Sequence, residues 1–430
     1  MMDPGYAVSH GLIARTRDFL AGGDRQEKAV CALARALHAE MPPVFPLDHG
    51  LWVARSHAAV KALASSASTS IDPGRLDARF RAAEVPEIDR AIRASLVLQD
   101  PPEHTRLRRI IAPFFTRRRL KALAQDTAGW LEQKLQAAER AGKRLEFVQE
   151  IAEPMILETT RRVMGWQVAP LQKLHRWSHI LAAQIMCFGQ SEEDKTLARD
   201  AFAQFGAFLA EERKRRRRHN RRDRAKDDGD LYDALLAAEE DGAIADPDEL
   251  AAQCLLLLVN GMETGPTFLA ALVRRLLKEE GHRADLRTHP EGIAGFLEES
   301  LRCDGSVPMI ARVTVEDSVL DGVAIPRGAA VIGLVAIANR DGQVFAEPGR
   351  FDPKRRPNPH LSLGAGPHRC LGNALIRLHG AAVLHVFSQL THPPRLPPDA
   401  TRFHHKPALR GPQSLSLQFE KARRHGAVIR

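Results

Sequence analysis

The chain has 430 residues, of which 44% are hydrophobic, and this is enough apolar material for a large folded core. Its formal net charge of +9 is concentrated in residues 213–226, which carry ten basic side chains and one acidic one, so the rest of the chain is close to neutral. No aromatic residue interleaves that run and no DNA-reading motif surrounds it, which argues against a nucleic-acid partner and favours a solvated helix end or loop.

The composition also argues against a membrane protein and against a disulfide-stabilised one. The longest unbroken apolar run, Cys254 to Val259, is far too short to span a membrane, and residues 1–10 lack the basic-then-apolar pattern of a signal segment. The five cysteines, at positions 31, 187, 254, 303 and 370, are scattered without a Cys-x-x-Cys pair. We therefore expect a soluble cytoplasmic protein with reduced thiols and no membrane partner.

Helical periodicity dominates the chain, with short strands near its start and in its last third. Segments 44–47 and 51–53 predict a hairpin and 57–67 a helix, whereas 73–99 predicts a long loop with at most one short helix. A capping box at Asp100-Pro-Pro-Glu103 predicts the start of the next helix, with Asp100 as its N-cap.

The second half of the chain continues this helical pattern. Long helices are predicted at 118–141, 149–165, 170–188 and 194–219. A second capping box, Asp246 to Glu249, opens an apolar helix that extends from Leu250 to about Leu277. Strands are expected between Ile310 and Leu334, and a C-terminal hairpin at about 402–420. Because no linker or internal repeat divides the chain, the pattern predicts one mainly α domain, residues 1–430, with small β-sheets.

Two pairs of charged residues have helical spacing. His104 and Arg108 stand four residues apart, so a helix places both on one face, although two solvated surface cations commonly share this spacing. Glu299 and Arg302 stand three residues apart on an amphipathic helix, a pattern that occurs elsewhere in the chain and is weak by itself.

A polar notch is predicted in the long apolar helix. Glu263 stands beside Thr264 after a run of leucines. Burial of a charged side chain at such a place costs free energy, which suggests that the charge has a functional role. Gly261 weakens the helix, and Pro266 cannot donate to the carbonyl of Met262, so the backbone should kink. The notch would present an acid and a hydroxyl; the alternative is a structural kink whose freed carbonyls are capped by Thr264.

The most informative segment is His360–Gly372, which contains one cysteine, Cys370, at the tip of a glycine-containing loop. Gly364 and Gly366 remove side chains where a flat cofactor would lie against the backbone, and they free the chain to turn N–H groups toward the sulfur. A helical apolar pattern follows, which places the sulfur at a helix N-terminus, with a cationic His368 two positions earlier. This arrangement suits axial ligation of haem iron; the alternative is a small buried hydrophobic residue.

The spacing from Gly364 to Gly372 resembles the haem-thiolate loop of the cytochrome P-450 monooxygenases, whose pattern is Phe-Gly-x-Gly-x-His/Arg-x-Cys-x-Gly. Leu363 stands in place of the phenylalanine, a change that bears on the potential of the iron and not on haem binding. Further motifs match in the same order over residues 40–420. The resemblance implies the mainly α cytochrome P-450 fold, haem b as cofactor and Cys370 as the axial ligand of its iron.

The resemblance also implies roles for the residue pairs described above. Glu263 and Thr264 match the family's distal helix, Ala-Gly-x-Glu/Asp-Thr, where the hydroxyl and the acid assist oxygen activation and proton delivery. Asn260 replaces the small residue of that motif, and Pro266 follows where another hydroxyl residue often stands. The residues that match the family's haem-propionate contacts are His104, Arg108, Arg312 and His368, whose donors suit two carboxylates. The residues that match its structural Glu-Arg-Arg triad are Glu299, Arg302 and Arg350.

A substrate pocket is expected, by resemblance, from four parts of the chain. They are the 73–99 loop, the 180–212 helix pair, the helix residues Leu256, Val259 and Asn260, and the segment with Val307, Pro308 and Met309. These residues are mainly aliphatic, which indicates a largely apolar small organic substrate. The excess of arginine over lysine fits a bacterial source, and we expect a role in natural-product biosynthesis.

The implied reaction is the oxidation, most simply the hydroxylation, of that substrate with O2. Because no flavin or iron–sulfur motif appears, electrons should come from NAD(P)H through a ferredoxin reductase and a ferredoxin. A basic docking face for the acidic ferredoxin is predicted from Arg106, Arg109, Arg117, Arg118, Arg119 and Arg369.

Two alternatives remain open. The same fold could catalyse desaturation, ring coupling or another atypical oxidation, which the changes at Asn260 and Pro266 favour. Or the protein could be a non-catalytic helper homologue, against which Cys370, Glu263 and Thr264 argue.

Overall fold

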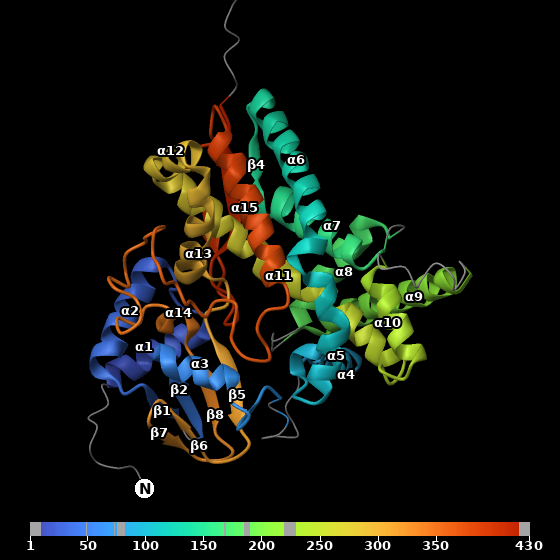
Figure 1. The fold of residues 1–430 in the computed structure, drawn as a ribbon, viewed down its shortest axis with the longest axis horizontal. Helices are drawn as coiled ribbons and strands as arrows, with labels where there is room; N and C mark the ends of the chain where they lie inside the picture. The colour runs from blue at the N-terminus through green and yellow to red at the C-terminus, as the bar shows by residue number, and fades with distance from the viewer. Residues whose placement is uncertain are drawn as a thin grey trace, which may run out of the picture.

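The computed structural model describes residues 10–48, 50–72, 74, 82–166, 169–184, 190–218 and 229–420. A β-rich region with the first helices occupies one side of the molecule, and a larger helical region occupies the other (Figure 1). The helices are α1 (His10–Ala21), α2 (Glu27–Glu40), α3 (His57–Ser65), α4 (Pro86–Ala94), α5 (Glu103–Ile111), α6 (Arg117–Ala141), α7 (Glu153–Val163), α8 (Leu171–Gln184), α9 (Glu192–Arg218), α10 (Leu231–Glu240), α11 (Pro247–Lys278), α12 (Glu280–Thr288), α13 (Ile293–Asp304), α14 (Val335–Ala338) and α15 (Asn373–Gln389).

The described strands form three small sheets. The five-stranded sheet has the order β1-β2-β8-β5-β3, in which only β2 and β8 are parallel neighbours. The three-stranded sheet has the order β4-β10-β9, and β6 pairs with β7. The strands are β1 (Val44–Asp48), β2 (Leu51–Ala54), β3 (Thr69–Ser70), β4 (Arg144–Glu146), β5 (Ile310–Thr314), β6 (Ser318–Leu320), β7 (Val323–Ile325), β8 (Ala330–Gly333), β9 (Thr401–Phe403) and β10 (Pro412–Gln418).

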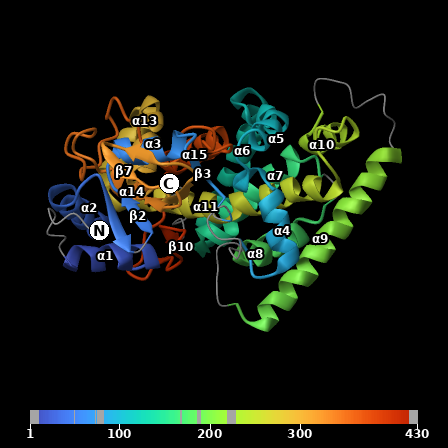
Figure 2. The ribbon, with the colours of Figure 1, turned by 90° about the horizontal axis from the view of Figure 1, so that it is seen from below.

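Helix α11 crosses the molecule and organises its core. It runs through the middle of the helical region, where α7, α8, α4 and α15 pack against it (Figure 2). Its start is fixed by Asp246, whose carboxylate accepts the Glu249 N–H at 2.8 Å, and the helix continues through Pro266. By length and composition alone α11 could cross a membrane, but 67% of its most apolar window is buried inside the fold. This burial is what a core helix requires.

Most of the predicted elements are confirmed, and one helix start is wrong. The hairpin, the four long helices and the strands after Ile310 lie where the patterns place them, within a few residues. Asp100 does not cap α5, whose N-cap position is Pro102 and makes no side-chain cap bond. The Asp100 carboxylate instead accepts from Ser70 and from the Ile71 N–H, so it ties the start of α5 to β3. Local spacing could not show this competing long-range partner.

The described part of the basic run, residues 213–218, is structural at Arg213 and Arg216, whereas Lys214, Arg217 and Arg218 are exposed as expected of a solvated helix end. Arg216 is buried, and its guanidinium pairs with Glu212 at 2.8 Å and with Asp230 and Asp233 at 2.7 Å. Arg213 pairs with Glu239 at 2.7 Å. These contacts join the end of α9 to α10, whereas residues 219–226 lie outside the described part of the chain.

The predicted triad is correct in two residues and wrong in the third. Glu299 and Arg302 are fully buried on α13 and pair at 2.6 Å. The second arginine on Glu299 is Arg355, at 3.2 Å, whereas the Arg350 side chain is exposed and pairs with Glu347. A turn at Asp352 points Arg355 inward, and only the backbone carbonyl of Arg350 joins the network, where it accepts from Arg302 at 2.9 Å. Several arginines close together in the sequence could not be told apart by spacing.

We expect Arg355→Ala to lower the free energy of unfolding by about 3 kcal/mol, because it leaves a buried carboxylate with one of its two cations. Arg350→Ala is the matched control and should change it by less than about 0.5 kcal/mol, since its own ion pair is exposed. Denaturant unfolding of both variants measures the difference. Equal losses would contradict the assignment of Arg355.

Candidate functional site

The loop before Cys370 is a tight, hydrogen-bonded turn. The Cys370 N–H donates to the Leu363 carbonyl at 2.8 Å, and the Arg369 N–H donates to the Gly366 carbonyl at 3.1 Å. Gly364 and Gly366 have φ of +71° and +66°, a region that favours glycine. Helix α15 begins three residues after Cys370. The predicted cysteine at a helix N-terminus is therefore confirmed.

The reason for glycine at position 366 differs from the prediction. A Cβ atom there would lie 2.6 Å from the Ala64 carbonyl oxygen and 2.8 Å from Ser65 Cα, at the end of α3. The loop thus packs backbone to backbone against α3. A Cβ at Gly372 would lie 3.8 Å from the Cys370 sulfur, an ordinary contact.

Opposing effects act on the thiol of Cys370. Burial raises its pKa, whereas a hydrogen bond from the Gly372 N–H and the positive charges of Arg108 and Arg377 lower it. His368 contributes no charge, because burial and the neighbouring His104 and Arg312 lower its pKa to about 3. The predicted cationic His368 is therefore wrong. The backbone N–H and the arginines are the groups that stabilise a thiolate once a metal has displaced the thiol proton.

The segment on each side of Cys370 is held by Glu298 of α13. Its carboxylate binds Arg377 of α15 at 2.6 Å and His360 at 3.1 Å. Burial alone would raise the pKa of Glu298, but the bonds from His360 and Arg377 outweigh it and lower the pKa to about 2. The carboxylate is therefore charged at neutral pH and fixes the loop between these two partners.

Beside this loop the structure gathers the four residues predicted to bind propionates. The His104 and His368 rings lie 4.1 Å apart, and both nitrogens of His104 and Nε2 of His368 are buried without a hydrogen-bond partner. Arg108 donates to the Arg369 carbonyl at 2.7 Å, and Arg312 donates to the Ala311 carbonyl at 2.7 Å. In the described part of the chain neither arginine forms an ion pair.

These four residues form a site suited to an anion, and the protein carboxylate that acts on three of them, from Asp100, makes no hydrogen bond to them in the described residues. Burial lowers the pKa of Arg312 to about 10, and the negative charge of Asp100 opposes this shift only in part. Orphaned buried donors of this kind are rare in folded proteins and call for a ligand. A planar cofactor with two carboxylates fits this set, and Cys370 supplies the iron ligand. The residues present therefore fit a haem.

The distal pair on α11 is oriented by two different contacts. Thr264 Oγ1 donates to the Asn260 carbonyl at 3.1 Å, four residues earlier on the helix, and not to the Met262 carbonyl that Pro266 leaves without its N–H donor. The Glu263 carboxylate pairs with Lys406 at 2.6 Å, and 29% of the Glu263 side chain is exposed. Gly265 lies against α7, since a Cβ there would come 2.4 Å from Ile156 Cδ1. The small residue before Pro266 is thus explained by helix packing.

The six expected substrate contacts differ in exposure. Asn260 has an exposed side chain and Val307 is partly buried, whereas Leu256, Val259 and Pro308 are buried. Met309 is partly buried and packs against the hydrophobic cluster of α1, α2 and β1. The assignment of these six residues to a substrate pocket stays a prediction.

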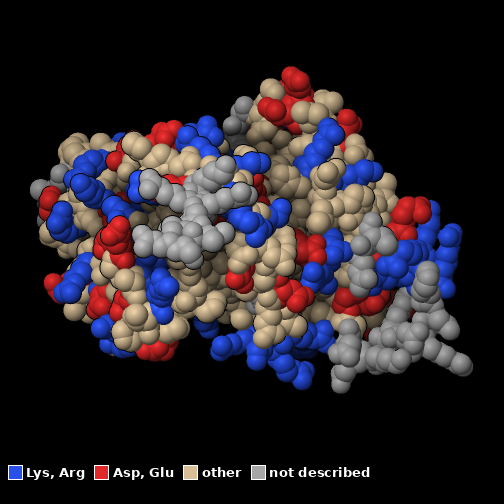
Figure 3. All heavy atoms as spheres, turned by 90° about the horizontal axis from the view of Figure 1, so that it is seen from above, with Lys and Arg blue, Asp and Glu red and all other residues tan. Residues whose placement is uncertain are grey.

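Part of the predicted basic docking face is confirmed as exposed. Arg109, Arg117, Arg118 and Arg369 are exposed, whereas Arg106 pairs with Glu249 at 2.5 Å and Arg119 donates to the Gly229 carbonyl at 3.0 Å. Arg106 is therefore used within the fold. Over the face shown in Figure 3, lysine and arginine side chains are spread across the surface and along its edges, with acidic groups among them.

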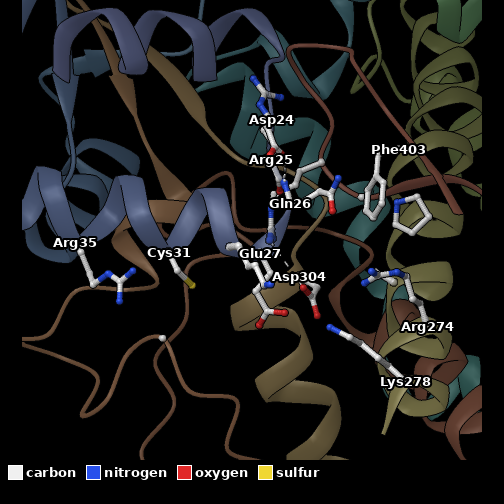
Figure 4. Close-up of a pocket in the computed structure, with 16 residues that line it drawn as sticks. Asp24, Arg25, Gln26, Glu27, Cys31, Arg35, Arg274, Lys278, Asp304 and Phe403 are labelled. Atoms are coloured by element: carbon white, nitrogen blue, oxygen red, sulfur yellow. Dashed lines mark hydrogen bonds and ion pairs between the residues drawn. The ribbon is translucent and has the colours of Figure 1, made fainter. Parts of the chain in front are cut away.

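A separate polar pocket lies between α2, the end of α11 and β9 (Figure 4). Its buried charges are already used: Arg25 donates to the carbonyls of Phe19 and Leu409, and Arg410 donates to the carbonyls of Arg25 and Cys303. We interpret this pocket as a surface hollow over a structural arginine network.

Sequence reasoning missed Arg355, Glu298 and Lys406. The Glu298 partners have no regular spacing from it, and Lys406 lies 143 residues from Glu263. The sequence offered one visible signal, and it concerned Glu298. This acid directly precedes Glu299, and because neighbouring residues point to different sides of a helix, it had to have partners of its own.

Comparison with known proteins agrees with this geometry. The family model described as Cytochrome P-450 matches residues 293–398. Nocardicin C N-oxygenase of Nocardia uniformis subsp. tsuyamanensis is 32% identical over 397 residues, covering 89% of this chain and 94% of that protein. The crystal structure of CalO2 matches with a TM-score of 0.81 at 26% identity, over 93% of this chain and 98% of the other. Cytochrome P-450 BioI, in complex with acyl carrier protein ligated to hexadec-9Z-enoic acid, matches with a TM-score of 0.80 at 25% identity, over 92% and 100%.

We expect Gly366→Ala to reduce the haem bound per protein, because the new methyl group meets the backbone of α3 as well as an unfavourable φ. Gly242→Ala is the matched control, since Gly242 has φ of +72° with open space around it. The control should cost about 1–2 kcal/mol of stability and leave haem content unchanged. The ratio of haem to protein absorbance measures the effect, and equal ratios would contradict the close packing on α3.

Proposed function

The chain belongs to the cytochrome P-450 family and is an oxidoreductase that acts with molecular oxygen, and from this premise we propose its reaction. It oxidises, most simply hydroxylates, a largely apolar small organic molecule in bacterial secondary metabolism, with two electrons supplied from outside. The observation that carries the proposal is Cys370 on its glycine turn beside buried imidazole nitrogens of His104 and His368 that lack a hydrogen-bond partner. When bound, the haem supplies the reductive activation of O2.

Residues of this chain bind and orient the cofactor. Cys370 provides the sulfur ligand, and the Gly372 N–H and Arg108 stabilise its negative charge. His104, His368, Arg108 and Arg312 would hold the two propionates, which would give an imidazole N–H of each histidine an acceptor. The carboxylate of Glu298 keeps the loop and α15 in register around the sulfur.

On the opposite side, α11 provides the groups that handle protons. Hydroxylation of a C–H bond with O2 consumes two electrons and two protons and releases water, so protons must enter the pocket. Glu263 is partly exposed and bound to Lys406, which suits exchange of protons with solvent. The Thr264 hydroxyl, one residue further along α11, would orient a water or O2 by turning from the Asn260 carbonyl.

The substrate side of α11 supports a mainly apolar ligand with one polar contact. Leu256 and Val259 are aliphatic, and Asn260 presents an exposed amide. An amide at this place supports recognition of a substrate that carries a carbonyl, hydroxyl or amine group. The proposal places the reaction in the cytoplasm, where NAD(P)H, a ferredoxin reductase and a ferredoxin supply electrons.

Asn260 also favours a second candidate, an oxidation without oxygen insertion. Its amide replaces the small residue expected beside the distal acid, at the point where a substrate radical would be held. Desaturation or ring coupling then removes two hydrogen atoms, whereas hydroxylation adds one oxygen atom. The mass of the product separates the two reactions. A non-catalytic helper would form no product at all.

We expect the wild-type protein, reduced under carbon monoxide, to show the strongly red-shifted Soret band of thiolate-ligated haem. Cys370→Ser should abolish that band, because a hydroxyl cannot replace the thiolate as a strong donor. Cys31→Ser is the matched control, since Cys31 is also a partly buried free cysteine, and it should retain the band. An unshifted band in the wild type, or a shifted one in Cys370→Ser, would overturn the proposal.

We expect reversal of the charges of Arg109, Arg117 and Arg118 to slow reduction by an acidic ferredoxin at least about tenfold at low salt, because steering depends on complementary charge. Arg369 is left unchanged in this variant because its charge acts on the Cys370 thiol. Reversal of the exposed Arg217 and Arg218, at the end of α9, is the control and should have no effect. Stopped-flow reduction measures both variants, and unchanged rates in the first would refute a docking face there.

A further inference from the structure

Away from Cys370, three metal-ligating side chains converge where α8 crosses the start of α7. Glu153 is the first residue of α7, and His175 and His179 are one turn apart on α8. Their separation of four residues puts both imidazoles on one helix face. The site thus combines two neighbouring rings on one helix with a carboxylate from another.

The three ligand atoms form a nearly equilateral triangle. The distances are 3.0 Å from His175 Nε2 to Glu153 Oε2, 3.1 Å from His179 Nε2 to the same oxygen, and 3.1 Å between the two nitrogens. Ligand atoms placed about 2.0–2.1 Å from one zinc ion lie about 2.9–3.3 Å apart, depending on the coordination geometry. The triangle therefore already has the size of one face of a metal coordination shell.

Hydrogen bonding alone explains this triangle poorly. If both imidazoles donate their Nε2 hydrogens to the single oxygen of Glu153, the two N–H donors crowd against each other, with their nitrogens 3.1 Å apart and no hydrogen bond between them. If one imidazole accepts from the other, it loses its bond to the carboxylate. A cation at the centre satisfies all three atoms at once.

The surroundings allow an ion to enter and remain. The side chains of His175 and His179 are 40% and 43% exposed, whereas that of Glu153 is only 8% exposed. Solvent therefore reaches one side of the triangle, where water would complete the coordination, and the buried carboxylate anchors the other side. No lysine or arginine pairs with Glu153 in the described part of the chain, so its charge is available to a cation.

We propose that Glu153, His175 and His179 bind one divalent cation of borderline softness, such as Zn2+. Two imidazoles and a carboxylate are the donor set of several zinc enzymes, and imidazole favours Zn2+ over Mg2+ or Ca2+. The ion would join α8 to the first turn of α7. Because α8 is part of the helix pair expected to border the substrate pocket, the ion would stiffen that border.

The test uses the haem-loaded protein after treatment with a chelator. Equilibrium dialysis against micromolar Zn2+ measures metal bound per haem, and we expect the wild type to bind one ion more than His179→Gln. Glu153→Gln is a second variant, and each should weaken this ion at least about 100-fold, the upper limit for loss of a merely supporting group. Circular dichroism and the Soret band verify that both variants are folded.

The matched control is His289→Gln. His289 is an exposed imidazole next to the carboxylate of Asp285, at 3.4 Å, and it belongs to no group of three metal-ligating side chains among the described residues. It should bind zinc as the wild type does, which separates the site from general histidine binding at the surface. Anomalous diffraction at the zinc edge should place the ion between α7 and α8. Equal stoichiometry in all variants, or an ion at another position, would overturn the proposal whether or not the protein proves to be a monooxygenase.

Discussion

Two neighbouring carboxylates on α13 hold the chain on both sides of Cys370. Glu299 gathers Arg302, Arg355 and the Asp352 N–H, and so fixes the irregular segment before the loop. Glu298, on the adjacent helix face, binds His360 at the loop entrance and Arg377 on the helix after it. Because Glu299 is fully buried, its charge requires these partners, and the partly buried Glu298 links two segments through its own ion pairs. The position of the sulfur follows from these two acids.

The residues predicted to bind the haem propionates show the opposite case, because here the cationic groups lack paired acids in the part of the chain that the structure describes. There, burial lowers the pKa of His368, Arg312, His104 and Arg108, and no internal acid pairs with either arginine in the described residues. Burial of these groups therefore lowers the stability of the fold until two carboxylates bind to them. Cofactor binding relieves that cost, so haem should stabilise the fold in addition to enabling its chemistry. Around Glu299 the protein supplies the cations that neutralise a buried acid, whereas at the propionate site it supplies the cations and the ligand would supply the acids.

The sequence predicts local features of this fold better than long-range pairings. Regular periodicity and turn residues located most helices, the hairpins and the glycine turn before Cys370, because each depends on residues close in the chain. Arg355, Lys406 and the real partner of Asp100 were missed, because each contact joins segments that only the folded chain brings together. The charge of His368 was wrong for a related reason: a side chain's ionisation depends on burial that no local pattern shows.

The distal acid shows how far such long-range control extends. Glu263 is held by Lys406, which belongs to the segment between β9 and β10, and this segment is fixed in turn by the pairing of β10 with β4 and β9. The charges of Glu263 and Lys406 also reach α8, where the first raises and the second lowers the pKa of His179. Hydrogen bonding to Glu153 raises that pKa more than either charge does, and burial opposes it. The ion-pair partner of the acid on α11 is therefore supplied by the C-terminal hairpin, and the charges of this pair act in turn on α8, although the hairpin and α8 are distant from each other in the sequence.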